Sequence, residues 1–268
     1  MEYKMHPEPE YDNHQPGSGK LKGKKCVVTG GDSGIGRAVA VAFAKEGADV
    51  AIIYLSEDRD AEETSRIIGE KFNAECLSVR ADISKEKNCS RAIDKIVKHF
   101  GKIDVLVNNA AVHYPAESLE KIETDNMLHT FAVNIFAMFW ITKAVLPHMG
   151  KGGSIINTSS VTAYRGSGGL LDYSSTKGAI VSFTRSLSAK LADKKIRVNG
   201  VAPGPIWTPL VPSSFDKKKV STYGTETPMG RAGQPSEVAP CYVFLAGEDG
   251  AYMSGQFLHP NGGEIING

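Results

Sequence analysis

Residues 25–36 read Lys-Cys-Val-Val-Thr-Gly-Gly-Asp-Ser-Gly-Ile-Gly (KCVVTGGDSGIG), and the apolar stretch AVAVAFA follows at residues 38–44. The first five residues lack polar alternation, which is typical of a strand buried on both faces. Glycines then allow the backbone to turn tightly and approach an anion, and the start of the following helix offers free N–H groups and partial positive charge. Glycines also occur in ordinary turns, but their place between a strand and a helix predicts a dinucleotide-binding turn.

The rest of the chain alternates short apolar strands with longer amphipathic helices. This order predicts right-handed crossovers and a doubly wound parallel sheet of the Rossmann type, an α/β fold in one domain over residues 24–268. Ligands of such folds bind beyond the carboxyl ends of the strands. The expected strands are Lys25–Thr29, Asp49–Tyr54, Glu75–Arg80, Val105–Asn108, Ser154–Thr158, Arg197–Ala202 and Gln256–Leu258. The expected helices include Arg37–Glu46, Ala61–Phe72, Lys87–Phe100, Met127–Met149, Ser174–Asp193 and Ser236–Ala246.

Composition excludes several classes of function. The 268 residues carry 31 Lys plus Arg against 30 Asp plus Glu, so the positive footprint that nucleic acids require is missing. No purely apolar run approaches the length that spans a bilayer, and the scattered histidines show no metal-ligand spacing, so we expect neither membrane nor metal. Four cysteines without CxxC pairs indicate reduced thiols and a cytoplasmic protein.

Residues 1–23 form a separate segment, polar and interrupted by Pro7, Pro9 and Pro16. It has no apolar core of the kind that targeting signals contain. Such a composition cannot bury enough surface to fold alone. We expect an extended arm that lies on the domain, and the sequence indicates no role for it.

Tyr173 and Lys177 are four residues apart in a predicted helix, so their side chains share one face. A nearby ammonium group favours phenolate and would lower the tyrosine pKa, which suits a general acid/base. The pair alone carries little information, because tyrosines and lysines are common in this chain. Ser160 lies 13 positions upstream, just after the strand SIINTS, so both hydroxyls could reach one pocket at the sheet edge.

With these motifs in order, the chain resembles the short-chain dehydrogenase/reductase family of Rossmann-type oxidoreductases from about residue 24 to its end. Ala111 replaces the glycine usual in the family's Asn-Asn-Ala-Gly motif. The arm and the ending NGGEIING resemble a bacterial subgroup of general-stress-type oxidoreductases that includes glucose/ribitol dehydrogenase-like members. The matching positions are Thr29–Gly36, Asp82, Asn108–Ala111, Asn134, Ser160, Tyr173, Lys177 and Pro203-Gly204.

The resemblance implies the catalytic roles. Tyr173 would exchange a proton with the substrate oxygen while hydride moves to or from the nicotinamide. Ser160 would hydrogen-bond that oxygen, with Ser159 as the other candidate. Lys177 would bind the nicotinamide ribose and lower the pKa of Tyr173. Asn134 would hold a water that relays protons to Lys177, although an Asn in a helix is more often a packing residue.

The resemblance also implies the residues that bind the dinucleotide. Asp82 and Ile83 would contact adenine, although Asp82 could instead cap the next helix. Asn109 and Ala110 would flank the adenosine ribose. Around the nicotinamide we expect Pro203, Gly204, Ile206 and Thr208, the last two serving its carboxamide. The remaining expected contacts are Gly30, Asp32, Ser33, Gly34, Ile35, Gly36, Tyr54, Leu55, Tyr173 and Lys177.

The choice of cofactor depends on the end of the second strand, where acidic residues bind the ribose of NAD and basic residues the 2′-phosphate of NADP. Tyr54 occupies that position, so neither signal is present. Asp32, Glu57 and Asp58 would repel a phosphate unless Arg59 turned towards it. The residues favour NAD, with NADP or dual use as the alternative.

Residues 209–230 are long, polar and interrupted by proline, which predicts a lid over the substrate. We expect an NAD(P)-dependent oxidoreductase acting on a secondary alcohol/carbonyl pair. The alternatives are an NADPH-dependent carbonyl or aldehyde reductase and a regulatory protein that binds nicotinamide without catalysis. The family resemblance and the apolar excess of Met127–Met149 and Ser174–Asp193 predict a homotetramer.

Overall fold

The computed structural model describes residues 1–266 and contains one sheet of seven parallel strands. The strand order is β3-β2-β1-β4-β5-β6-β7, which is the doubly wound arrangement predicted from the sequence. Strand boundaries agree with the prediction to within one residue. They are β1 (Lys25–Thr29), β2 (Asp49–Tyr54), β3 (Cys76–Arg80), β4 (Val105–Asn108), β5 (Ser154–Thr158), β6 (Arg197–Val201) and β7 (Phe257–Leu258).

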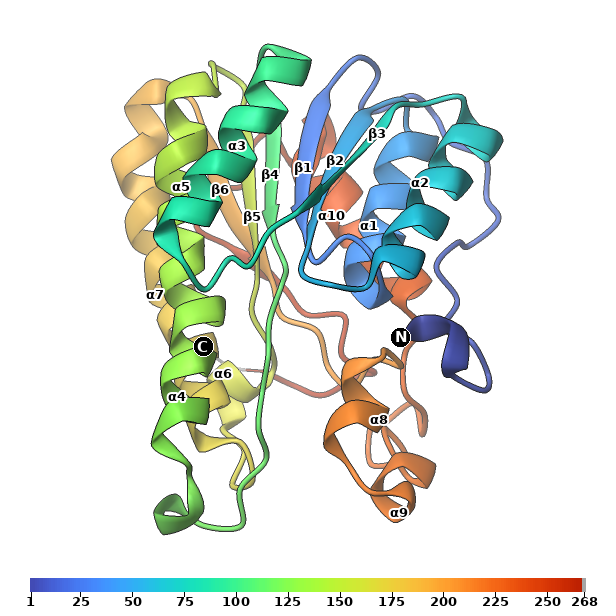
Figure 1. Cartoon of the computed structure of the whole chain (residues 1–268), viewed down its shortest axis with the longest axis vertical. Helices are drawn as coiled ribbons and strands as arrows, with labels where there is room; N and C mark the ends of the chain where they lie inside the picture. Colours follow the sequence, from blue (N-terminus) through green and yellow to red (C-terminus); the bar gives the residue numbers. More distant parts are fainter. Residues whose placement is uncertain (267–268) are drawn as a thin grey trace.

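Helices cover both faces of the sheet (Figure 1). One face packs against α1 (Gly34–Lys45), α2 (Asp58–Phe72) and α10 (Pro235–Ala246), and the other against α3 (Glu86–Phe100), α5 (Ala137–Val145) and α7 (Leu171–Leu191). Because the central strands are buried on both sides, their side chains are apolar without alternation.

The register brings the carboxyl ends of the strands to one edge. Thr29 of β1 pairs with Ile53 of β2, and Thr158 of β5 with Val201 of β6. The residues that follow each strand therefore meet below the sheet, where the remaining short helices lie (Figure 1). These are α4 (Thr124–Phe131), α6 (Thr162–Arg165), α8 (Leu210–Ser214) and α9 (Lys217–Ser221).

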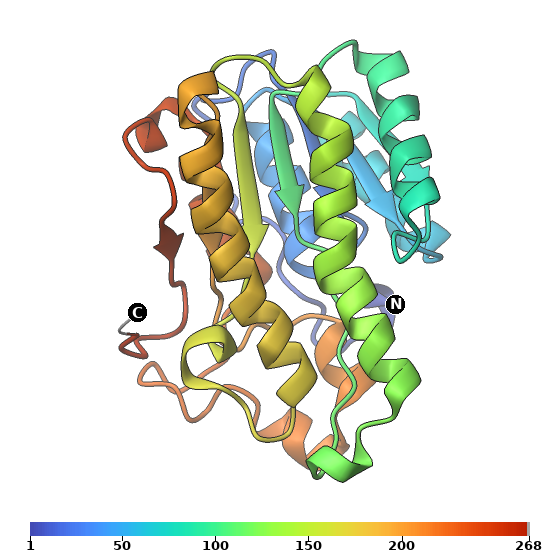
Figure 2. The same cartoon turned by 90° about the vertical axis from the view of Figure 1, so that its left-hand side faces the viewer.

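The helix predicted over Met127–Met149 begins earlier and is irregular. It consists of α4, a π-helical turn at Ala132–Phe136, α5 and a 3-10 turn at Leu146–His148. Thr124–His148 is long and apolar enough to cross a membrane by length and composition. However, Ala137, Ile141 and Val145 pack into the core on one face of the sheet. The run is therefore a core helix with an apolar outer face, which Figure 2 shows beside α7.

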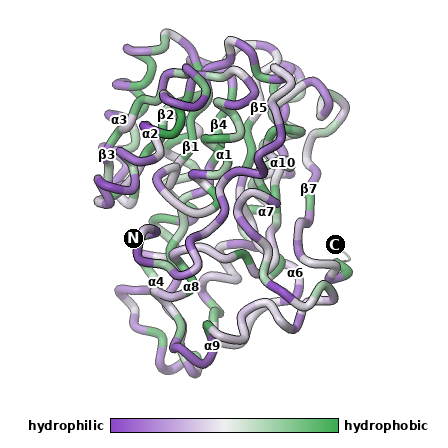
Figure 3. Tube along the Cα trace, turned by 90° about the vertical axis from the view of Figure 1, so that its right-hand side faces the viewer, coloured by the Kyte–Doolittle hydropathy of each residue, from purple (hydrophilic) through white to green (hydrophobic). Residues whose placement is uncertain are grey.

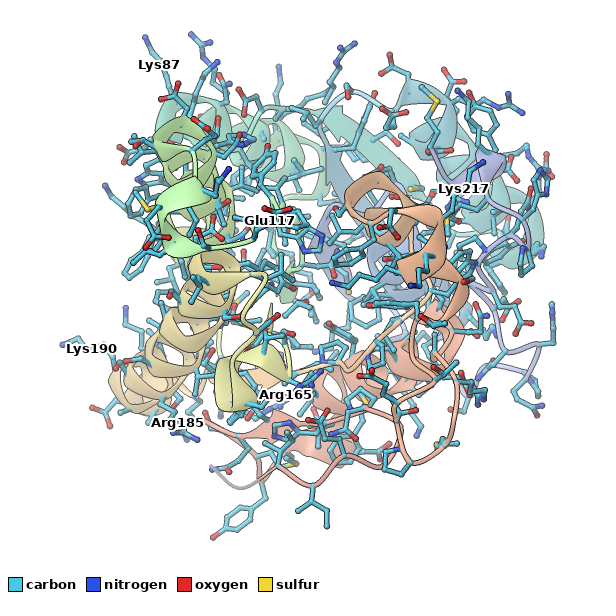
Figure 4. The ribbon with its side chains drawn as sticks, turned by 90° about the horizontal axis from the view of Figure 1, so that it is seen from below. Lys87, Glu117, Arg165, Arg185, Lys190 and Lys217 are labelled. Carbon is cyan, nitrogen blue, oxygen red and sulfur yellow. The ribbon has the colours of Figure 1, made fainter. Side chains whose placement is uncertain are left out.

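Two segments lie outside the regular layers of the fold. Residues 209–230, predicted as an irregular lid, contain α8 and α9. Figure 4 looks from below and shows Glu117, Arg165 and Lys217 on three different segments around this side of the molecule. The N-terminal arm is mostly hydrophilic and runs beside α10 (Figure 3).

Candidate active site

The glycine turn between β1 and α1 has the conformation that its composition requires. Gly30 and Gly34 have φ values of +62° and +51°, which side-chain-bearing residues rarely adopt. A Cβ atom on Gly36 would lie 1.8 Å from the carbonyl oxygen of Gly30. Glycine at this position therefore lets the helix approach the turn.

Hydrogen bonds between the end of β1 and the residues after β4 hold the turn on the sheet. The Thr29 hydroxyl accepts hydrogen bonds from the backbone N–H groups of Asn109 (2.9 Å) and Ala110 (3.0 Å). In return, the Asn109 amide donates to the carbonyl oxygen of Thr29 at 3.1 Å. The Asn-Asn-Ala-Ala stretch after β4 thus supports the glycine turn as well as lining the cleft.

The start of α1 fits a pyrophosphate. Within residues 1–266, the N–H groups of Ile35 and Gly36 have no acceptor, whereas Arg37 N–H already bonds the carbonyl oxygen of Ser33. Free N–H groups at the positive end of a helix are the usual ligands of a dinucleotide phosphate. The local geometry therefore suits the group that the sequence predicts.

A cleft of about 1010 Å³ runs along the carboxyl edge of the sheet. This volume lies at the upper end for small-molecule sites and suits an extended ligand. Almost all predicted site residues line it; Gly36 and Asn134 do not. The lining includes Gly30, Asp32, Ser33, Gly34, Ile35, Tyr54, Leu55, Asp82, Ile83, Asn109, Ala110, Ser160, Tyr173, Lys177, Pro203, Gly204, Ile206 and Thr208.

The end of β2 is closed by a network of side chains. The Tyr54 hydroxyl donates to Asp58 at 2.9 Å, and the same carboxylate pairs with Arg80 at 3.2 Å. Arg59 instead stacks on the ring of Tyr3, 3.8 Å from its centroid. Arg59 and Arg80, which lie near the end of β2, therefore already have partners, and neither lines the cleft.

Asp82 does not cap α3, which begins at Glu86 with Lys85 as its N-cap residue. Its carboxylate instead accepts the backbone N–H of Ser84 at 3.0 Å and the Ser84 hydroxyl at 2.6 Å. This bond closes a short turn after β3 that presents Asp82 and Ile83 to the cleft. The alternative that Asp82 caps α3 was therefore wrong. Its predicted contact with the adenine stays a prediction.

The structure brings Ser160, Tyr173 and Lys177 together at the other end of the cleft. The Ser160 hydroxyl accepts hydrogen bonds from the backbone N–H and the hydroxyl of Thr162 at 3.2 and 3.1 Å, and it lies near enough to Tyr173 to lower the pKa of that phenol. By contrast, the Ser159 hydroxyl donates to the backbone carbonyl of Lys177 at 2.8 Å. The Nζ atom of Lys177 lies 5.3 Å from the centroid of the Tyr173 ring. It donates a hydrogen bond to the carbonyl oxygen of Thr158 at 2.8 Å.

The electrostatics of this pair differ from the expectation that Lys177 lowers the pKa of Tyr173. Burial raises the pKa of Tyr173 well above its ordinary value, opposed by the Ser160 hydroxyl. Burial also lowers the pKa of Lys177 to about 7. A lysine with this pKa is only partly charged near neutral pH, so it stabilises the phenolate less than a fully charged lysine at the same place would.

Asn134 lies in the π-helical turn, 2% exposed. Its side-chain oxygen accepts from Val112 N–H at 2.9 Å, and its amide donates to the Val112 carbonyl and to Thr176. The side chain thus joins the loop after β4 to α7. Its predicted role in a proton relay stays a prediction, and π turns of this kind are frequent at functional sites.

His113 is a site residue that the sequence did not indicate, because no spacing marks a single histidine. Its ring packs against Tyr173 with centroids 5.1 Å apart and against Phe215 at 5.7 Å. Burial and the nearby charge of Lys177 lower the pKa of His113 to about 4, so the imidazole is neutral at pH 7. Only its position two residues after the Asn-Asn-Ala-Ala stretch could have suggested it.

Residues 209–230 contribute a further tyrosine. Tyr223 lines the cleft near Tyr173 and near the backbone N–H of Ile206. Burial raises the pKa of Tyr223 to about 12, so its hydroxyl stays protonated at neutral pH. The end of the cleft around Tyr173 is therefore lined by polar residues from the sheet edge on one side and by aromatic residues of this segment on the other.

Comparison with known proteins agrees with this geometry. The family described as enoyl-(acyl carrier protein) reductase matches residues 30–264. An uncharacterized oxidoreductase, YhdF, of Bacillus subtilis is 57% identical over all of this chain and 92% of its own length. A glucose and ribitol dehydrogenase of Daucus carota is 51% identical over 100% of this chain and 94% of its own. An NADPH-dependent aldehyde reductase of Arabidopsis thaliana is also 51% identical, over 99% and 95%.

Solved structures show the same fold. A short-chain dehydrogenase from Burkholderia cenocepacia in complex with NADP superimposes with a TM-score of 0.85 at 31% identity, covering 91% of this chain and 98% of that one. A 3-ketoacyl-(acyl-carrier-protein) reductase from Brucella melitensis complexed with NADH gives a TM-score of 0.81 at 33% identity with the same coverage. These neighbours include proteins bound to either nicotinamide dinucleotide.

Proposed function

The chain belongs to the short-chain dehydrogenase/reductase family of oxidoreductases, and we propose that it interconverts a secondary alcohol and its carbonyl compound with a nicotinamide dinucleotide. The observation that carries this proposal is the grouping of Ser160, Tyr173 and Lys177 at one end of a cleft whose other end suits a pyrophosphate. A regulatory protein without catalysis is the weaker candidate, because all these side chains are present and adjacent.

In the proposed reaction, the bound dinucleotide accepts or supplies the hydride. Tyr173 donates its phenolic proton to the carbonyl oxygen during reduction and takes the proton back during oxidation. Ser160 donates a hydrogen bond to that oxygen at the position where negative charge develops. Lys177 lies beside the ring of Tyr173. Asn134 joins the loop after β4 to α7, the helix that carries Tyr173 and Lys177.

We favour NAD over NADP as the cofactor. The residues that line the cleft around the turn and the ends of β2 and β3 include Asp32, Glu57 and Asp82 but no Lys or Arg. A 2′-phosphate there would meet carboxylates, while Arg80 is paired with Asp58 and Arg59 is stacked on Tyr3. The name of the Arabidopsis relative supports NADPH as the alternative.

Calorimetric titration of the purified protein decides between the two cofactors. We expect NAD(H) to bind more tightly than NADP(H). A dissociation constant for NADP(H) tenfold below that for NAD(H), about 1.4 kcal/mol, would contradict the preference.

The substrate is a small molecule with a hydroxyl or carbonyl group. The names of the relatives suggest sugars, polyols and aldehydes as a first panel. Turnover is measured by nicotinamide absorbance with each cofactor and each compound, with ketones added to the panel. Binding of a dinucleotide without turnover of any compound would favour the regulatory alternative.

We also propose a homotetramer in the cytoplasm, built from residues 24–268 as one catalytic domain with residues 1–23 as its arm. Large apolar side chains are exposed on the outer face of α4, α5 and α7, among them Leu128 (56%), Phe139 (52%) and Leu171 (41%). A face of this kind is typical of a subunit interface. Light scattering at micromolar concentration should give four times the chain mass, and a monomer mass would refute the assembly.

A further inference from the structure

We propose that the N-terminal arm contributes to cofactor binding, because Glu2 holds the glycine turn in position for the pyrophosphate. This inference rests on the proposed function, because it concerns binding of the same dinucleotide. It assigns a role to residues that lie outside the family's Rossmann domain and that the sequence left without one.

Glu2 lies behind the turn, with only 3% of its surface exposed. One carboxylate oxygen accepts the backbone N–H of Gly34, the first residue of α1, at 2.5 Å. The other accepts from the guanidinium of Arg37 at 2.5 Å. Hydrogen bonds to an ionised group are about twice as strong as neutral ones, so one side chain holds both the turn and the first helical turn.

Arg37 connects Glu2 to the glycine turn and to α2. Its Nε donates to the carbonyl oxygen of Asp32, within the glycine turn, and to the hydroxyl of Thr64 in α2. Asp60 of the same helix accepts the backbone N–H of Glu2 at 3.0 Å. All of these side chains are buried, so removing the Glu2 carboxylate would leave a buried guanidinium without its close partner.

The contact between Glu2 and Gly34 decides which N–H groups at the start of α1 remain free. Gly34 N–H is committed to Glu2, whereas the N–H groups of Ile35 and Gly36 have no acceptor within residues 1–266. Glu2 itself does not line the cleft, although Met1 beside it does. The carboxylate therefore lies behind the turn as a support and leaves the N–H of Ile35, which lines the cleft, for the ligand.

The same arm also contacts the loop after β6, which carries the residues predicted to flank the nicotinamide. The indole N–H of Trp207 donates to the carbonyl oxygen of Pro7 at 2.8 Å. Trp207 stands between Ile206 and Thr208, both of which line the cleft. Thr208 in turn lies close to Gly34, where an added Cβ would be 3.2 Å from it. The arm thus contacts the glycine turn through Glu2 and the loop around Trp207 through Pro7, five residues further along the arm.

The test compares Glu2→Ala and Glu2→Gln with Glu8→Gln, a matched control in the exposed part of the same arm. Calorimetry with NAD should show a dissociation constant raised about tenfold for Glu2→Ala, a smaller increase for Glu2→Gln, and none for Glu8→Gln. At saturating NAD, kcat and the KM for the substrate should stay within about twofold of wild type.

Fragments of the cofactor separate positioning from general loosening. ADP carries the pyrophosphate and adenosine does not, so Glu2→Ala should weaken ADP binding and leave adenosine binding unchanged. Equal loss for both fragments, or an unchanged or tighter NAD affinity in folded Glu2→Ala and Glu2→Gln, would overturn the inference. If Glu2→Ala does not fold, Glu2→Gln carries the test alone. Failure of the wild-type protein to bind any nicotinamide dinucleotide would instead refute the proposed function.

Discussion

The two walls of the cleft differ in what holds their residues. One wall consists of residues at or just after the ends of β1, β4 and β5, such as Thr29, Asn109 and Ser160, and the pairing of the strands places them. The other wall consists of residues 209–230 and the loop after β4, whose side chains, such as His113, Phe215 and Tyr223, contact each other rather than the sheet. We therefore expect changes in the first wall to affect cofactor binding or chemistry, and changes in the second to affect substrate recognition.

The largest effect should come from Tyr173→Phe. The ring keeps its packing against His113, but the proton donor is lost, so turnover should fall by about 10³-fold. Calorimetric affinity for NAD should stay close to wild type. Activity within a few-fold of wild type would refute the proton-transfer role of this residue.

Lys177 of α7 lies beside the first wall, where it donates to the carbonyl oxygen of Thr158, and its burial leads to a prediction about stability. Because the pKa of Lys177 is lowered to about 7, the unfolded chain binds a proton between pH 7 and 10.5 that the folded chain does not, and this group's contribution to stability rises with pH over that range. Lys177→Met removes the penalty. It should therefore melt above wild type at pH 7, and the difference should shrink towards pH 10.

Differential scanning fluorimetry without cofactor, at half-unit steps from pH 7 to 10, measures this trend. A melting difference that does not change with pH would show that Lys177 is not desolvated as the structure indicates. Turnover of Lys177→Met should fall at every pH, though by less than in Tyr173→Phe, because methionine cannot donate the hydrogen bond predicted from Lys177 to the nicotinamide ribose.

Thr29→Val tests the support of the glycine turn from the sheet. Valine keeps the shape but leaves the partly buried N–H groups of Asn109 and Ala110 without their acceptor, at a cost of about 1 kcal/mol for each group. The NAD dissociation constant should rise about tenfold, with kcat at saturation little changed. Thr29→Ser is the matched control and should behave like wild type. An equal loss in both variants would indicate a packing effect instead.

The smallest effect should come from His113→Leu in the second wall. Leucine fills a similar volume, but a polar partner for the substrate is lost, so the substrate KM should rise a few-fold to tenfold. NAD affinity should not change. His148→Asn, at an exposed position far from the cleft, is the control. A change in NAD affinity for His113→Leu would show that the two walls are not separate.

Much of the fold could be predicted because it depends on local patterns. The runs of apolar residues at Lys25–Thr29 and Ser154–Thr158 predict buried strands, and the structure confirms them. Helix starts were less accurate: α7 begins at Leu171 rather than Ser174, and α4 at Thr124 rather than Met127. Caps and first turns depend on contacts with the rest of the molecule, which no local pattern records.

The sequence by itself determined the parallel sheet, the place of the glycine turn and the family, because each depends on residues that are close together in the chain or repeat with a fixed period. Only the tertiary structure showed that Ser160 rather than Ser159 faces Tyr173, that Lys177 is buried deeply enough to lower its pKa, and that His113 packs against the same tyrosine. Likewise, only the tertiary structure brings Glu2 to Gly34 and Arg37, more than thirty residues away. Orientation, desolvation and long-range contacts arise from packing, which composition and spacing do not encode.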